Sequence, residues 1–310
     1  MNSKSLVAAI ALVLGSAAFA ETTTVTTTTE TTSKVNVGNN APERKNIDEE
    51  ITNAKLRATT GSKKLWSFGS SFSYAGGAIT NPGSTERPQL NDGLVALDPT
   101  KLSGQLSIKY RMTDHDNLNI GFGVDYTPEY TNNKTTGTKT SAKANASTPY
   151  VSYGRVFKAG EVQNVFDAGI SKYTADEDVN DSKLNYAVSL SHTVMTSLGT
   201  SKAEVGFNTF FNQDIFSEQT GNNVIYSFGL FPIFEYAITD AVSFRTVSRW
   251  LLWNVANNAR DEAKLAGQTQ SMGVGFAVTR DIYLYPNMQW RWSALTADKT
   301  TVGLSANINL

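Results

Sequence analysis

The segment LNIGFGVDY (residues 118–126) alternates strictly between an apolar residue and a small or polar one. Successive side chains of a β-strand point to opposite faces, so this pattern predicts a strand with one apolar and one polar face. The same period of two occurs in twelve runs between Leu65 and Leu310, and this segment is one of them. Most runs have about ten residues, the length that a tilted strand needs to cross a bilayer.

The connections between these runs alternate in length. Short ones, such as 113–117 and 280–281, alternate with longer ones, such as 75–101 and 127–147. Membrane barrels have this order of short periplasmic turns and longer extracellular loops, and an even strand number puts both chain ends in the periplasm. A soluble β-sandwich also buries one face of each strand, but aromatic residues gathered at the strand ends favour the barrel. We therefore predict an all-β fold, a transmembrane antiparallel up-and-down β-barrel of about 12 strands over residues 63–310.

The composition excludes several classes of protein. The 310 residues include 27 Lys+Arg and 28 Asp+Glu, no cysteine and two histidines, and the mean hydropathy is −0.27. Net charge near zero argues against nucleic acid as a partner, because no positive field gathers phosphates. The absence of cysteine excludes disulfides and cysteine-ligated metals. We expect no cofactor and no metal site.

The N-terminal residues are expected to be an export signal followed by a tether. Lys4 precedes an apolar run at 6–14, and Ala18-Phe19-Ala20 has the small-x-small pattern of a cleavage site, which predicts a signal peptide over 1–20. Residues 21–45 are rich in threonine and have no apolar face to bury, so we interpret them as a flexible tether.

A short amphipathic helix is predicted over residues 46–62. Ile47, Ile51 and Ala54 fall on one stripe of a helix, and Asn46 is an acceptable N-cap. The stripe is thin, so the helix needs a surface to rest on. Two interpretations stay open: a plug near the barrel mouth, or a spacer on the periplasmic side.

With its signal peptide, its alternating connections and an alternating last strand, the chain resembles porin-like bacterial outer-membrane β-barrel proteins over residues 65–310. The resemblance implies an outer-membrane location with both termini periplasmic, and contacts with outer-membrane lipid and lipopolysaccharide. It also implies that barrel-insertion machinery reads the C-terminal strand, where Leu310 replaces the usual aromatic residue. It identifies no subfamily, catalytic motif or substrate.

The predicted inner face carries small residues and charges of both signs. Such a lumen is wet, and its charges either form a constriction that selects solutes or pair across the wall and rigidify it. We expect Glu204, Glu235 and Arg245 at a similar depth near the periplasmic end. The inward-facing charged residues are Lys109, Arg111, Asp125, Asp167, Glu204, Glu235, Arg245, Arg249 and Arg291.

One inward sector is less polar, and the strand within it carries Gly273 and Gly275. Aromatic rings that cover glycine backbone stabilise a curved sheet. A binding site for an apolar or sugar ligand is the alternative, and a third option is that the predicted helix rests here. The sector is formed by Phe231, Val247, Leu251, Trp253, Tyr283 and Tyr285.

Catalysis is not expected. His115 lies in a turn without an evident pocket, and His192 follows Ser191, whose side chain points to the opposite face of the strand. The acidic segment 176–181 begins like a calcium loop but lacks its glycine and its bidentate glutamate.

The favoured function is a narrow passive channel for small hydrophilic solutes, because the inner face is small, polar and of mixed charge. The alternative is a closed barrel that acts as a structural or surface-interaction protein through its extracellular loops. Neither the solute nor the oligomeric state follows from the sequence.

Overall fold

The structure is a computed structural model that describes residues 51–60, 64–88, 90, 98–133, 138–219, 223–258, 260, 262–265 and 268–310. The predicted signal peptide and tether lie outside the described residues. So does the first part of the predicted helix, including Asn46 and Ile47.

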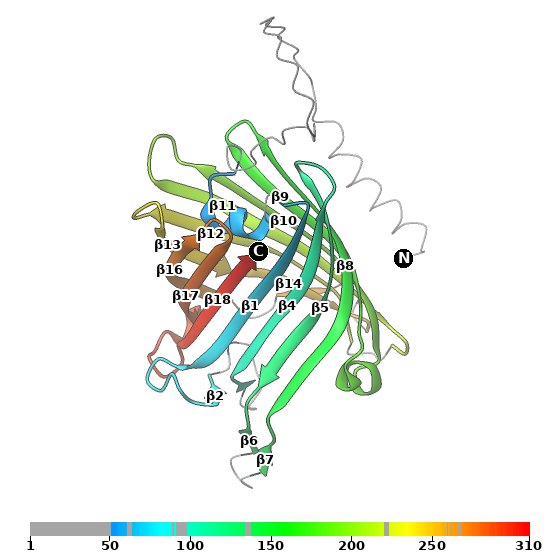
Figure 1. The fold of residues 1–310 in the computed structure, drawn as a ribbon. Coiled ribbons are helices and arrows are strands. Elements are labelled where there is room, and N and C mark those ends of the chain that lie inside the picture. Colours follow the sequence, from blue (N-terminus) through cyan, green and yellow to red (C-terminus); the bar gives the residue numbers. More distant parts are fainter. Residues whose placement is uncertain are drawn as a thin grey trace, which may run out of the picture. The chain divides into compact units, whose positions relative to one another are not determined.

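The described residues form a closed antiparallel β-barrel with twelve strand positions, as predicted (Figure 1). Each strand position pairs with the next one along the chain, and the last pairs with the first, which closes the barrel. One position is shared by two segments, β13 (Val242–Arg249) and β14 (Leu251–Ala256), which both pair with β12 (Val224–Ala237). The wall consists of β1 (Trp66–Ala78), β4 (Lys101–Arg111), β5 (Asp116–Thr127), β8 (Lys143–Ala159), β9 (Val162–Lys172), β10 (Leu184–Ser197), β11 (Ala203–Phe216), β12 (Val224–Ala237), β13 (Val242–Arg249), β14 (Leu251–Ala256), β16 (Thr269–Thr279), β17 (Ile282–Arg291) and β18 (Thr301–Asn309).

The two ends of the barrel differ, and we name them the short-turn end and the long-loop end. At the short-turn end, β8 and β9 are joined by two residues, and Gly160 there has φ of +59°, which glycine adopts without strain. The hairpin of β6 (Tyr130–Asn133) and β7 (Thr138–Thr140) projects at the long-loop end (Figure 1). The additional elements of the long connections are β2 (Glu86–Arg87), β3 (Asp98–Pro99), β6 (Tyr130–Asn133), β7 (Thr138–Thr140), β15 (Ala263–Leu265), the π-helix η1 (Glu177–Asp181) and the 3-10 helix η2 (Trp292–Ala294).

The alternation of the sequence decides what each face of the wall presents. Ile108 and Ile120 point outward and are 58% and 57% exposed, whereas Ser107 and Asn119, their neighbours in the chain, point inward and are 7% exposed. The large apolar side chains thus coat the outside of the barrel and the polar ones line its inside, the reverse of a soluble protein core. No helix in the described ranges is long and apolar enough to span a membrane.

The one α-helix in the described part of the chain, α3 (Ala54–Thr60), lies inside the short-turn end of the barrel (Figure 1, short blue helix). It begins later than the predicted residue 46, because residues 51–53 are not helical. The Asn53 side chain explains this boundary: its Oδ1 accepts a hydrogen bond from the backbone nitrogen of Leu56 (3.1 Å), so Asn53 is the N-cap.

Candidate functional site

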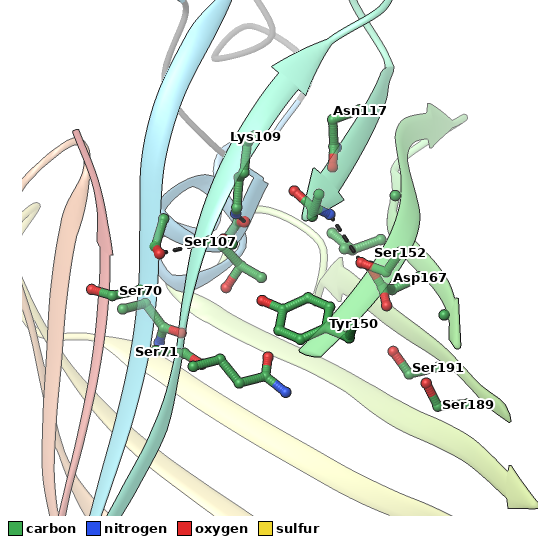
Figure 2. A pocket seen from close by; sticks show the side chains of 18 of the residues that line it. Ser70, Ser71, Ser107, Lys109, Asn117, Tyr150, Ser152, Asp167, Ser189 and Ser191 are labelled. Atoms are coloured by element: carbon green, nitrogen blue, oxygen red, sulfur yellow. Dashed lines mark hydrogen bonds between the residues drawn. The ribbon is translucent and has the colours of Figure 1, made fainter. Parts of the chain in front are cut away.

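The inner wall on the long-loop side of α3 surrounds a polar cavity of about 410 Å³ (Figure 2). Lys109 and Asp167 face it from strands β4 and β9, with Tyr150 of β8 between them. Asn119 donates to Ser152 Oγ (3.1 Å), and Ser152 donates to Asp167 Oδ2 (3.2 Å), so the carboxylate is held by a short relay. Most of the remaining lining is hydroxyl, amide or glycine, contributed by residues such as Ser71, Gln105, Ser107, Gly169, Ser189, Ser191, Thr193 and Asn307.

A second cavity, of about 400 Å³, lies at the short-turn end. It is lined by Asn53 and Arg57, by Glu204 and Glu235, and by residues of the turns around 201 and 240. Ala58 and Thr59, near the other end of α3, line the first cavity. Since α3 contributes to both cavities and contacts strands on opposite sides of the barrel, it lies across the lumen between them.

Polar contacts hold the N-terminal end of α3 to the wall. Gln163 Oε1 accepts hydrogen bonds from the backbone nitrogens of Thr52 and Asn53, both at 2.9 Å. Asn53 Nδ2 donates to Glu204 Oε2 (2.5 Å) and to Glu235 Oε2 (3.2 Å). One buried amide therefore bridges two carboxylates that face each other on neighbouring strands.

The C-terminal end of α3 is held by side chains that donate to its free carbonyl groups. Lys109 Nζ donates to the Thr59 oxygen (2.9 Å), and Asn309 Nδ2 donates to the Ala58 oxygen (2.5 Å) and the Thr59 oxygen (3.3 Å). Helix C-termini leave such carbonyls unpaired and carry partial negative charge, so a lysine there is favourable.

Apolar packing seats the helix on two sides. Ile51, which is fully buried, and Leu56 pack in one cluster with wall residues from β8, β10 and β12: Val156, Met195 and Ile233. Ala54 and Ala58 pack against Tyr283 and Tyr285 of β17. The predicted stripe residues Ile51 and Ala54 thus both face the barrel wall.

Three of the predicted lumen charges lie together at this end. The strand register pairs Glu204 with Glu235 and Glu235 with Arg245. Arg245, only 1% exposed, forms an ion pair with Glu235, and Ser243 Oγ donates to the same carboxylate (2.6 Å). A buried pair of this kind holds a local structure, since removing either partner leaves a bare charge.

The other predicted charges are distributed around the inner wall. Asp125 lies toward the long-loop end, where Lys101 Nζ is 3.8 Å from its carboxylate. Arg249 and Arg291 both stand beside Thr269, on opposite sides of β16, and Arg111 is buried in β4. The nine charges therefore do not form a single ring at one depth.

Only some residues of the predicted aromatic sector face the lumen. Tyr283 covers Gly275, where an added Cβ would collide with the tyrosine hydroxyl, so this glycine is required by close packing. Tyr285 donates to the Arg245 carbonyl oxygen (3.0 Å). Phe231 packs on Phe210 with ring centroids 5.2 Å apart.

Trp253 and Leu251 correct the prediction, because they face outward. Four residues of β12, from Leu230 to Ile233, lie opposite five on its partner, from Val247 to Leu251. This extra residue at the β13–β14 junction reverses the alternation, as a β-bulge does. Trp253 consequently stacks on the outward Phe228, with ring centroids 5.3 Å apart.

Both histidines make local contacts with wall residues. His115 Nδ1 lies 2.9 Å from the Val156 carbonyl oxygen, and His192 Nε2 lies 3.0 Å from Asn164 Oδ1, beside the Phe166 ring. Neither of these contacts is with a hydroxyl nucleophile.

Two residues that hold α3, Gln163 and Asn309, were not among the predicted site residues. No local pattern marks either of them, because their partners lie 110 and 251 residues away in the chain.

No family model matches this chain, and no curated protein does. Solved structures do match. An outer membrane channel from Pseudomonas putida F1 is 11% identical, with a TM-score of 0.52, and the match covers 80% of this chain and 96% of that one. The NanC porin is 7% identical with a TM-score of 0.42, covering 78% of this chain and 100% of that one. With the closed twelve-position barrel, the first of these likenesses shows that the chain has the fold of the bacterial outer-membrane β-barrels.

Proposed function

We propose that this protein is a narrow passive channel for small hydrophilic solutes in the bacterial outer membrane, with both termini in the periplasm. The observation that carries the proposal is the hydroxyl- and amide-lined cavity of about 410 Å³ inside the barrel. Outer-membrane lipid and lipopolysaccharide would contact the apolar outer wall, and the insertion machinery would read β18. No catalytic role is included.

In this proposal α3 is a plug at the periplasmic mouth. It has seven residues, too few to be a stable helix in water without its contacts. Hydrogen bonds and two small apolar clusters hold it, rather than a continuous core. Such a segment fits a reversible obstruction better than a permanent part of the wall.

The alternative is a closed barrel that serves as a structural or surface-interaction protein through its long loops. The position of α3 across the lumen favours it. So does the additional structure of those loops, where Lys143 pairs with Glu177 and Lys139 Nζ lies 2.8 Å from Glu129 Oε1.

Single-channel conductance in planar bilayers separates the two functions. The full-length protein is expected to conduct weakly or intermittently, and a variant without residues 21–62 is expected to conduct steadily and more strongly. If neither protein conducts, the channel is refuted and the closed barrel remains. Steady conductance that is identical in both would refute the plug.

A further inference from the structure

The cavity of about 410 Å³ presents two opposite charges, Lys109 and Asp167, that form no ion pair with each other. Lys109 Nζ donates to the Thr59 carbonyl oxygen, and Asp167 accepts from Ser152. A third charged residue that lines the cavity, Arg155, has its own counter-charge, because its Nη1 lies 3.3 Å from Asp116 Oδ1. The cavity thus offers one positive and one negative group to a solute.

The strand order fixes how far apart these charges are. Lys109 is on β4 and Asp167 on β9, with β5 and β8 between them. Three strand spacings of about 4.8 Å separate the two backbones by about 14 Å along the wall. The long lysine side chain shortens this span, and Figure 2 shows Lys109 and Asp167 on either side of the Tyr150 ring.

The lining between the charges is neutral and polar. Asn119, Ser152 and Ser189 offer hydrogen-bond donors and acceptors, and the Tyr150 ring adds a flat surface. A solute of one net charge would be attracted by one end of this arrangement and repelled by the other. A dipolar solute of matching length would be attracted by both.

We propose that this cavity binds small zwitterions whose charges lie several bonds apart, with dipeptides as the fitting class. The carboxylate would approach Lys109, and the ammonium would approach Asp167, which the Asn119–Ser152 relay orients. The volume falls within the range of about 300–1,000 Å³ that small-molecule sites occupy. The inference rests on the proposed channel for its biological meaning, because it names the solute class that would pass.

Equilibrium binding to the full-length protein in detergent micelles tests the site apart from transport. The probe is glycylglycine, compared with the neutral N-acetylglycinamide, the anionic N-acetylglycine and the shorter zwitterion glycine. Glycylglycine is expected to bind at least threefold tighter than each of the others. Equal binding of N-acetylglycinamide would overturn the proposal, since hydrogen bonding alone would then explain the affinity.

Two substitutions test the residues. Asp167→Asn and Lys109→Met are each expected to weaken glycylglycine binding roughly three- to tenfold, the effect of one partly exposed charge pair. Asp125→Asn, at an inner-wall carboxylate outside the cavity lining, is the control and is expected to bind like wild type. Unchanged binding in Asp167→Asn would overturn the proposal.

Lys109 also holds α3, so a separate variant controls for helix release. Gln163→Ala, outside the cavity lining, removes an α3 contact without changing charge and is expected to leave glycylglycine binding unchanged. A loss equal to that of Lys109→Met would overturn the assignment of the carboxylate to Lys109. Liposome swelling with glycylglycine then distinguishes the two proposals: binding without swelling refutes the channel, whereas swelling without discrimination among the four probes refutes the site.

Discussion

The two halves of the lumen are built on the same alternating strands, yet they differ in what fills them. At the short-turn end, α3 lies between the walls, Ile51 is fully buried, and Arg245 is paired with Glu235 out of contact with solvent. On the other side of the helix, Lys109 and Asp167 face an open, hydroxyl-lined cavity. The alternation of apolar and polar residues therefore determines the barrel wall, and the segment before β1 determines which part of the lumen is filled.

The largest difference is expected for the charges of the two halves. Arg245→Met leaves Glu235 buried without its partner and should lower the free energy of unfolding by about 3–5 kcal/mol. The matching change at the long-loop end, Lys101→Met, breaks a 3.8 Å contact between partly exposed groups and should cost less than about 1 kcal/mol. Urea unfolding in detergent micelles measures both. Equal costs would contradict the distinction between a packed and a wet half.

Substitution of Ile51 should release α3. Ile51→Glu places a charge in the cluster with Val156 and Met195, at a cost of several kcal/mol that undocking avoids. Ile51→Val, the matched control, should cost only about 1 kcal/mol and keep the helix in place. Trypsin tests this, because released helix exposes Lys55 and Arg57. Equal cleavage rates for the two variants would show that Ile51 does not anchor the helix.

Docking of α3 should depend on pH through Lys55. Arg245 nearby and burial lower the pKa of the Lys55 ammonium from 10.5 to about 7, Glu235 opposes this, and Arg249 adds to it. Because the docked pKa is the lower one, docking favours neutral lysine: it should strengthen as pH rises from about 7 toward 10.5, and be flat below 7. Conductance should therefore fall over that window, and Lys55→Met should flatten the response. An unchanged pH profile in Lys55→Met would contradict this role.

The smallest effect is expected on the outer wall, where Trp253 lies against Phe228. Trp253→Phe should leave stability nearly unchanged, within about 0.5 kcal/mol, because an aromatic ring is kept on an outward surface. It should also reduce the share of tryptophan emission that brominated lipids quench. If the substitution leaves the quenching unaltered, the Trp253 side chain faces the lumen and its outward assignment is wrong.

The sequence pattern was sufficient for the barrel and for one part of the site. A period of two assigns each strand its faces, and the short turn between β12 and β13 makes the pairing of Glu235 with Arg245 foreseeable. The pattern assigned Trp253 to the wrong face, because one extra residue near Trp250 reverses the faces of the strand and no local composition marks it. The residues that hold α3 could not be predicted either, since only closure of the barrel brings Gln163 and Asn309 to the helix.

The central claim, that α3 closes the lumen when docked, is tested most directly with a disulfide. The chain has no cysteine, so Ala58→Cys with Asn309→Cys supplies a single pair. The two residues are neighbours, because the Asn309 side-chain amide lies 2.5 Å from the Ala58 backbone carbonyl oxygen. Single-channel recordings of this variant should show low conductance without opening when it is oxidised, and larger conductance with openings after reduction. Conductance that is the same in the oxidised and reduced protein would contradict the account.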